Sequence, residues 1–317
     1  MRSVFERELV VITGKGGVGK TTIAAALGMA AARAGRRTIV VEVGEESRLP
    51  GLFGVAGARG GGECVLGENL SSISIDPDRA LLEWLQLLGG RLSGRVLASS
   101  GTFQYFAAAA PGAKELVTMV TVWQLTGRGD RRTGTYDLVV LDAPATGHAL
   151  GMLSSPRTFG AIARVGPVVK HTNHVRELLE SPARSAYLAV ALGTEMAVTE
   201  TLELRDGLHA RLGRDLDAVV LNALLPQRFT AAELQHLSTL TPHDAAAKDA
   251  MLAAQTIHRR ARFQHNQLAR LRQRGLSVVG IPFVWTAQLD LAGMEMISRR
   301  LERALSAPVS NEHAARV

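Results

Sequence analysis

Short stretches with strand character recur along the chain, separated by turn residues and by longer stretches of helical periodicity. The first, Leu9–Ile12, is a continuous apolar run that leads into a glycine-rich turn, and the alanine-rich stretch 20–34 after it ends at Gly35. Apolar runs of this length between turn signals are typical of buried strands, and glycine commonly ends a helix. The pattern predicts strands at 9–12, 38–43, 71–75, 138–141, 216–221 and 277–281.

Three longer segments follow a helical pattern. Asp76-Pro77 has the form of an N-cap followed by proline at the first helical position, and the apolar spacing after it stays helical to about residue 135. Residues 150–212 are predicted to be mainly helical and to end at Gly213. Thr230-Ala-Ala-Glu233 matches a capping box and opens a helical region that runs to about Arg274.

The alternation of strands and helices predicts an α/β fold with one doubly wound, mostly parallel sheet. The chain, residues 1–317, is interpreted as one domain. The long helical stretches at about 76–135 and 152–196 are interpreted as a helical subdomain inserted between strands of that sheet.

Composition narrows the class of protein. The chain is 46% hydrophobic, which is ample for a buried core, and it has one cysteine, which excludes an intrachain disulfide and any CxxC motif. No apolar run approaches the 18 or more residues that a membrane-spanning helix needs, and the charged N-terminus does not resemble a signal peptide. We therefore expect a cytoplasmic protein with no integral membrane segment.

The net charge of +7 comes mostly from arginine, with a cluster at 258–274. Such a cluster can bind nucleic acid or a membrane surface. Here the arginines alternate with Phe263, Leu268 and Leu271 at roughly helical spacing, which favours a solvated helix face that covers a sheet. No nucleic-acid partner is expected.

The segment GKGGVGKTT, residues 14–22, matches the phosphate-binding pattern G-x-x-x-x-G-K-[ST] between a predicted strand and a predicted helix. Glycines let backbone N–H groups converge on phosphates, and the helix N-terminus adds partial positive charge. Lys20 is predicted to reach the β- and γ-phosphates, and the Thr21 hydroxyl to bind Mg²⁺. The predicted nucleotide-binding residues of this loop are Gly14, Lys15, Gly16, Gly17, Val18, Gly19, Lys20, Thr21 and Thr22.

A second metal-binding residue is expected at the end of a buried strand. Asp142 ends the apolar run 138–141, and it is predicted to hold Mg²⁺ through water. The alternative is an aspartate that only caps the following helix.

The second lysine of the loop, Lys15, makes the pattern more specific. GKGGVGKTT resembles the deviant phosphate loop of the nucleotide-dependent dimerising ATPases. The stretch 142–150, DAPATGHAL, resembles the switch II motif D-T-A-P-T-G-H-T-L of one group of them, with the third and fourth positions exchanged. That group is the arsenical pump-driving and tail-anchored-protein-targeting ATPases. Counterparts of other family segments fall at 75–77, 111–115 and 219–222, so the resemblance covers nearly the whole chain.

The resemblance implies a Mg²⁺-ATP hydrolase that cycles between an ATP-closed and an open dimer, either a homodimer or a heterodimer with a paralogous ATPase. It also implies that Lys15 reaches the nucleotide of the other subunit and that Asn222 recognises adenine. A second cation near the γ-phosphate would offset developing charge, as an arginine finger does. The residue-level alternatives are an exposed loop lysine and a turn-forming asparagine.

The chain departs from the family at switch I, which normally reads T-D-P-A-H-S with an aspartate that positions the attacking water. The corresponding stretch is 41–47, VEVGEES, and Gly44 takes the place of the aspartate. Glu45, or else Glu42, is the candidate replacement. The alternative, that both are solvated loop acids and that hydrolysis is slow or depends on a partner, stays open.

Cysteine content restricts the function further. The zinc-binding CxxC pair of the eukaryotic-type targeting ATPases is absent, and one cysteine cannot form the thiolate site that arsenite activation needs. With one phosphate loop, the chain resembles a single-half bacterial member of the group.

Two other functions remain as alternatives. One is a targeting factor that binds a helix of a membrane-protein client in an apolar groove, whose candidate residues are Leu81, Leu85, Leu88, Met119 and Trp123. These side chains equally suit a subdomain core, because amphipathic helices bury such stripes by default. The other is a partitioning-type ATP switch that binds DNA, which the switch II resemblance disfavours.

Overall fold

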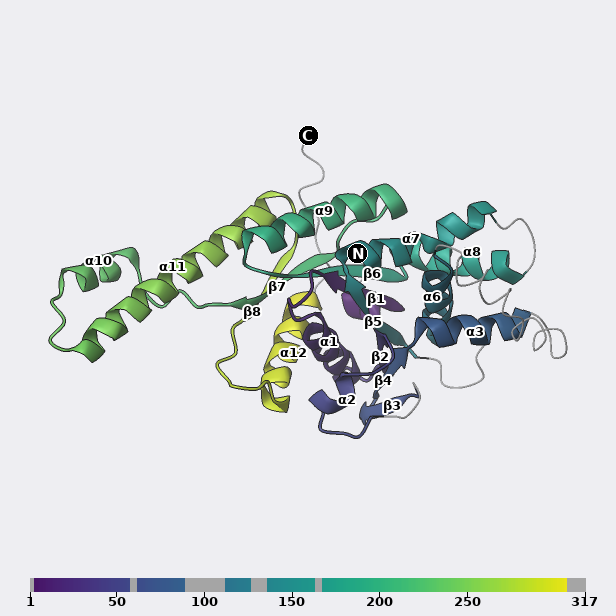
Figure 1. Ribbon diagram of the computed structural model, residues 1–317, viewed down its shortest axis with the longest axis horizontal. Helices are drawn as coiled ribbons and strands as arrows, with labels where there is room; N and C mark the ends of the chain where they lie inside the picture. The colour runs from purple at the N-terminus through teal and green to yellow at the C-terminus, as the bar shows by residue number, and fades with distance from the viewer. Residues whose placement is uncertain (1–2, 58–61, 89–111, 127–135, 163–166, 307–317) are drawn as a thin grey trace.

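A computed structural model describes residues 3–57, 62–88, 112–126, 136–162 and 167–306 (Figure 1). Within them, eight strands form one sheet in the order β3-β4-β2-β5-β1-β6-β7-β8, and every pairing is parallel except that of β3 with β4. The predicted doubly wound α/β fold is confirmed. The strands are β1 Leu9–Gly14, β2 Thr38–Val43, β3 Cys64–Gly67, β4 Leu70–Ile75, β5 Leu138–Ala145, β6 Ser185–Leu192, β7 Ala218–Leu224 and β8 Val278–Pro282.

Side chains of the strands contribute to two large clusters of buried residues, one on each face of the sheet. In β1, Leu9 and Val11 join one cluster, and Val10 and Ile12 join the other, because successive side chains of a strand point to opposite faces. Both faces are covered by helices, so both faces of a parallel strand here are buried and most of its positions are apolar. The strand β4 is the exception, since Ser71, Ser72 and Ser74 are buried in it.

Helices cover the sheet on both sides (Figure 1). On one face, the alanine-rich α1 packs beside α12, and both contribute to the cluster that contains Val10. On the other face lie α6, α7, α8 and α9, together with the end of α11. The helices are α1 Lys20–Arg33, α2 Leu49–Leu52, α3 Pro77–Leu88, α6 Ala113–Leu125, α7 Thr146–Ile162, α8 Pro167–Glu180, α9 Glu195–Leu212, α10 Ala231–Thr239, α11 Ala245–Gln273 and α12 Leu291–Leu305.

The prediction that 150–212 is mainly helical is wrong at β6, Ser185–Leu192. This strand pairs with β1 along its length and lies in the middle of the sheet. The second predicted subdomain segment, 152–196, therefore includes a sheet strand. The segment SAYLAVAL has the nearly continuous apolar character of a buried strand, but it lies between two stretches with a helical pattern and was therefore included in the predicted helical region.

Four helices, α3, α6, α7 and α8, pack against one another (Figure 1), and α6, α7 and α8 contact the sheet at β5, β1 and β6. Leu81, Met119 and Trp123 are buried among them, and Trp123 stacks on His174 with ring centroids 5.0 Å apart. These side chains therefore form subdomain core, which leaves them unavailable as an open groove. The side chains of Leu85 and Leu88 lie outside the described part of the chain, as do parts of the predicted helical stretch at 89–111 and 127–135.

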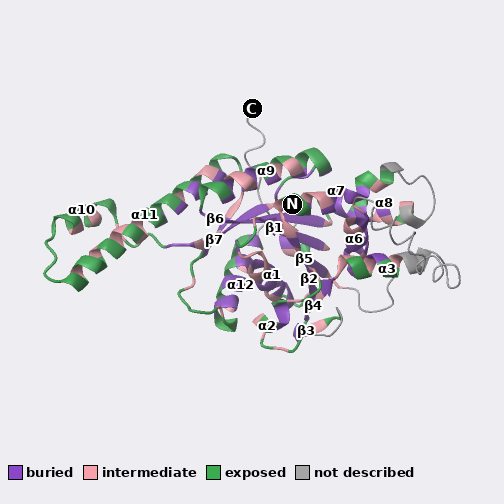
Figure 2. Cartoon of the chain, viewed as in Figure 1, coloured by how far each residue is buried: buried purple, intermediate pink, exposed green. Residues whose placement is uncertain are grey.

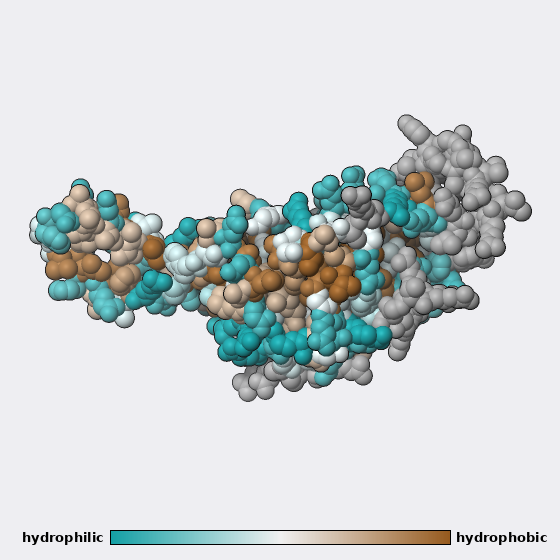
Figure 3. All heavy atoms as spheres, turned by 90° about the horizontal axis from the view of Figure 1, so that it is seen from below, coloured by the Kyte–Doolittle hydropathy of each residue, from teal (hydrophilic) through white to brown (hydrophobic). Residues whose placement is uncertain are grey.

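The hairpin of α10 and α11 extends away from the sheet as an arm (Figures 1 and 2). The predicted capping box at Thr230 and Glu233 is present, with Thr230 Oγ1 accepting from Glu233 N and Glu233 Oε2 from Thr230 N. No residue of α10 is buried, and Leu252 on α11 is 59% exposed. Hydrophobic side chains are visible at the end of this arm in Figure 3. The arginine cluster lies on the part of α11 nearer the sheet, where Leu268 and Leu271 are buried as predicted for a covering helix, whereas Phe263 is exposed.

Among the described residues, none of the helices combines the length and hydropathy that crossing a bilayer requires.

Candidate functional site

The phosphate loop joins β1 to α1 at the carboxyl edge of the sheet, and its glycines are required by close contacts. Gly14 has φ +146°, and a Cβ there would lie 2.1 Å from the backbone oxygen of Val190 in β6. Gly19 has φ +93°, and its Cβ would lie 2.5 Å from Asn222 Nδ2. The loop is thus held against β6 and β7, and α1 begins at Lys20 directly after it. The loop therefore ends at a helix N-terminus, and the free backbone N–H groups of a helix N-terminus suit an anion.

The structure brings Thr21 and Asp142 together. Thr21 Oγ1 donates a hydrogen bond of 2.5 Å to Asp142 Oδ2, although the two residues are 121 positions apart. The other carboxylate oxygen, Oδ1, is buried and has no hydrogen-bond partner among the described residues. A hydroxyl beside an unsatisfied carboxylate oxygen is a donor set that fits Mg²⁺, which prefers oxygen ligands.

Burial governs the charge of both ionisable groups in the loop region. It raises the pKa of Asp142 to about 6, against the opposing effects of the Thr21 hydrogen bond and the Lys20 charge. Burial also lowers the pKa of Lys20, with Asp142 acting in the opposite direction. Lys20 Nζ donates to Lys15 O at 3.1 Å. The two charges are partly desolvated, as expected of groups that exchange water for a ligand.

The raised pKa of Asp142 predicts that this carboxylate destabilises the ligand-free chain. In the folded state the pKa of Asp142 is about 6, above its ordinary value of 3.8, so the cost is absent below about pH 4 and complete above pH 6. Asp142→Asn should raise the free energy of unfolding by about 1–2 kcal/mol at pH 7 without nucleotide or Mg²⁺. Thermal unfolding from pH 4 to 8 measures this, and a difference that does not shrink toward pH 4 would contradict it.

Lys15 contacts two residues of α9 in the same chain. Its Nζ lies 2.5 Å from Glu200 Oε1 and 2.7 Å from Met196 Sδ. The Lys15 and Glu200 side chains are 37% and 33% exposed, so the pair is solvated and contributes little to stability. The ammonium group is therefore available to another partner at small energetic cost.

The predicted switch I loop follows β2, and its two candidate acids, Glu42 and Glu45, lie in different environments. Glu42 is buried, and its carboxylate accepts hydrogen bonds from Ser47 Oγ and from the backbone N–H groups of Arg48 and Leu49. Through these bonds, the Glu42 carboxylate holds the loop and the start of α2. Glu42 also lines the cavity beside Lys20 and Thr21, so both acids border the phosphate loop and only Glu45 is exposed.

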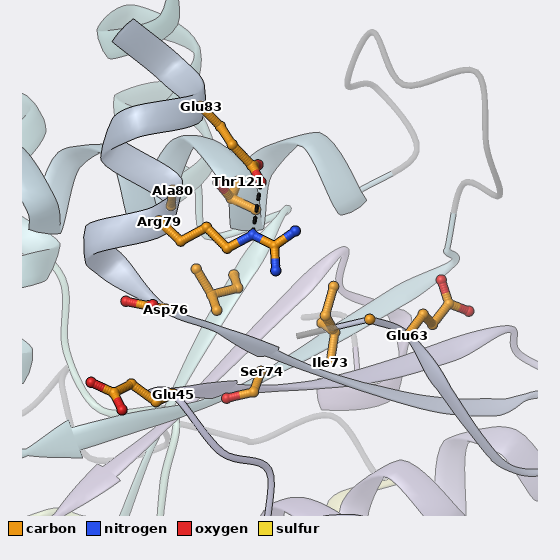
Figure 4. Close-up of a pocket in the computed structure, with 11 residues that line it drawn as sticks. Glu45, Glu63, Ile73, Ser74, Asp76, Arg79, Ala80, Glu83 and Thr121 are labelled. Atoms are coloured by element: carbon orange, nitrogen blue, oxygen red, sulfur yellow. Dashed lines mark hydrogen bonds and ion pairs between the residues drawn. The ribbon is translucent and has the colours of Figure 1, made fainter. Parts of the chain in front are cut away.

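Glu45 is exposed and lines two cavities. One, of about 570 Å³, is also lined by Lys20, Thr21, Glu42 and Asp142, and it is called the phosphate cavity below because it borders the phosphate loop. The other, of about 420 Å³, lies on the far side of the loop against α3, where Arg79 pairs with Glu83 (Figure 4). Glu45 thus stands at the boundary between the phosphate cavity and the helical cluster.

Gly44, which takes the place of the family's aspartate, is fixed by backbone contacts. Its N–H donates to Ile75 O at 2.9 Å, and its oxygen accepts from Ser74 Oγ at 2.7 Å. Its φ of +154° is unfavourable for a residue with a side chain. The local backbone therefore suits glycine at this position.

Asn222, at the end of β7, reaches the phosphate loop. Its Nδ2 donates to Val18 O at 2.9 Å, and its Oδ1 accepts from Ala223 N at 2.9 Å. The amide retains one further N–H and one further lone pair, which are the complementary groups that an adenine edge requires.

The sequence profile of the anion-transporting ATPases matches residues 7–165, which is half of the chain. The chain belongs to the anion-transporting ATPase family. ATPase BagA of Mycobacterium tuberculosis is 31% identical over 240 residues, covering 71% of this chain and 68% of BagA. ATPase GET3 of Kluyveromyces lactis is 26% identical over 257 residues, covering 68% of this chain and 72% of GET3.

Membership of the anion-transporting ATPase family confirms the resemblance inferred from the two motifs. The protein is an ATPase, and the family implies ATP binding. The roles of individual residues in this member stay predictions. Two residues beside the site, Glu200 and Gln264, were not singled out in the sequence. Glu200 contacts Lys15, which is 185 residues away in the sequence, and Gln264 contacts Leu225, which is about 40 residues away, so no local pattern marks either of them.

Proposed function

We propose that the protein hydrolyses Mg²⁺-ATP in a nucleotide-dependent dimer. The observation that carries the proposal is the hydrogen bond between Thr21 and Asp142, whose second carboxylate oxygen has no partner among the described residues. Both residues line a cavity of about 570 Å³ together with Lys20. Loop residues 14–22 bind the phosphates, Lys20 neutralises the β- and γ-phosphates, and Thr21 with Asp142 holds Mg²⁺. When bound, the metal offsets the charge of the phosphate oxygens.

Asn222 recognises the adenine base in this proposal, and Glu45 orients the attacking water. For Glu45 the support is its position on the phosphate cavity, together with the commitment of Glu42 to the loop backbone. For Asn222 it is the contact with Val18, which places the amide next to the phosphate loop.

Lys15 acts in trans, on the nucleotide of the partner subunit. The solvated ion pair with Glu200 supports this, because in the single chain the ammonium group of Lys15 is directed to α9 while Lys20 lines the phosphate cavity. Dimerisation would exchange Glu200 for a γ-phosphate as the partner of Lys15. The second subunit is taken to be another copy of this chain, and a paralogous ATPase is the alternative.

The oligomeric state tests the proposal. With Mg²⁺ and a non-hydrolysable ATP analogue, we expect a species of twice the chain mass by light scattering, and a single chain with ADP or without nucleotide. Lys20→Ala is the control and should remain a single chain throughout. A wild-type chain that stays single in all three states, while binding the analogue, would contradict the homodimer and favour a paralogous partner.

A further inference from the structure

The turn that follows Asn222 has a strained backbone. Ala223 has φ +55°, in the left-handed region that residues other than glycine, asparagine and aspartate seldom adopt. The pairing of β7 with β8 shifts register between Leu221 and Leu224, so the strand is irregular at this point. Such a conformation persists only when the surrounding structure holds it.

One side chain holds both ends of this turn. Gln264 of α11 accepts from Leu225 N through Oε1 at 2.8 Å and donates to Ala223 O through Nε2 at 3.3 Å. It is 7% exposed, so these bonds form away from water, where an unsatisfied amide would be costly. The neighbouring His265 Nε2 lies 3.3 Å from Leu225 O.

The position of Gln264 is itself fixed from the other side. Gly193, between β6 and α9, lies so close that a Cβ there would be 2.8 Å from the Cβ of Gln264 and 3.1 Å from its Cα. The absence of a side chain at Gly193 allows α11 to approach the carboxyl edge of the sheet. Directly after β8, Phe283 N donates to Leu224 O at 2.8 Å, which completes the support of the turn.

We propose that Gln264 is a positioning residue for base recognition, because it fixes the strained turn from which the Asn222 amide is directed. The inference rests on the proposed role of Asn222. It adds that selectivity for the nucleobase depends on a side chain of α11, the helix that carries the arm. Gln264 itself need not contact the nucleotide.

The test compares three ligands, ATP, GTP and inorganic tripolyphosphate, by calorimetric titration in the presence of Mg²⁺. In Gln264→Leu, we expect the ATP affinity to fall about tenfold and the preference for ATP over GTP to fall with it, while tripolyphosphate binding is unchanged. Gln264→Glu should lie between, because its carboxylate still accepts from Leu225 N and cannot donate to Ala223 O.

Gln267→Leu is the matched control. Gln267 lies one turn further along α11, is 9% exposed, and its Oε1 has no hydrogen-bond partner among the described residues. Its substitution should leave all three affinities unchanged. Equal weakening of the three ligands in Gln264→Leu, or the same effect from Gln267→Leu, would overturn the inference.

Asn222→Ala separates this inference from the proposed function. Loss of ATP preference in Asn222→Ala but not in either Gln264 variant would refute only the role of Gln264. Retention of the full preference in Asn222→Ala would refute base recognition by Asn222, and the inference with it. If Gln264→Leu fails to fold, the nearly isosteric Gln264→Glu carries the comparison.

Discussion

Lys20→Ala is expected to weaken ATP binding by about 10²-fold, which corresponds to about 3 kcal/mol for charge-assisted contacts with two phosphates. Lys20 lines the phosphate cavity beside Thr21 and Asp142, and its ammonium group is already partly desolvated. Its loss therefore removes positive charge where phosphate charge is greatest. Equilibrium binding of a fluorescent ATP analogue measures the effect.

Lys248→Ala serves as the control for Lys20→Ala. Lys248 is an exposed lysine on α11, in the arm, so its removal changes the net charge equally without altering the loop. Its ATP affinity should equal that of the wild type. An affinity of Lys20→Ala within twofold of this control would show that the loop does not bind phosphate as described.

Lys15→Ala is expected to reduce turnover by roughly 10³-fold, by analogy with an arginine finger supplied in trans. The affinity of the single chain for ATP should change little, because in that chain Lys15 pairs with Glu200. ATP-driven dimerisation should weaken in parallel with turnover. Steady-state hydrolysis and light scattering on the same samples measure the two effects.

Glu200→Gln distinguishes loss of the lysine from loss of its ion pair. This variant removes the same ion pair as Lys15→Ala, and a solvated pair of this kind is worth about 0–1 kcal/mol. Turnover should therefore stay within about fivefold of the wild type. A loss as large as that of Lys15→Ala would mean that the pair within one chain, and not a contact in trans, is what matters.

Local sequence signals predicted most of the sheet because each strand carries its own information. The second strand, Thr38–Val43, is found with its predicted bounds, since the apolar residues Ile39–Val41 and Val43 are typical of a buried parallel strand. The strand Ser185–Leu192 was missed between two helical stretches, although it is equally apolar. Its place next to β1 depends on pairing across more than 170 residues, which local periodicity does not contain.

Some residues of the candidate site were likewise predictable from local sequence, and others depend on tertiary contacts. The loop motif and Asp142 were predicted from their sequence context, and the contact between Thr21 and Asp142 follows from the pairing of β1 with β5. The sequence put Glu45 before Glu42 as the water-orienting acid, and the structure adds that Glu42 is buried and bonded to the loop backbone. The Glu200 contact with Lys15 is tertiary and has no local signature.

Subunit mixing tests the central claim, that Lys15 completes the site of the other subunit. Lys15→Ala and Asp142→Asn chains should each be nearly inactive alone. In a mixed dimer, the Lys15→Ala chain keeps its own Asp142 and receives Lys15 from its partner, so one of the two sites is complete. Equal mixing should restore about a quarter of wild-type turnover, because about half of the dimers are mixed. If differently tagged chains form mixed dimers and no hydrolysis returns, Lys15 does not act in trans.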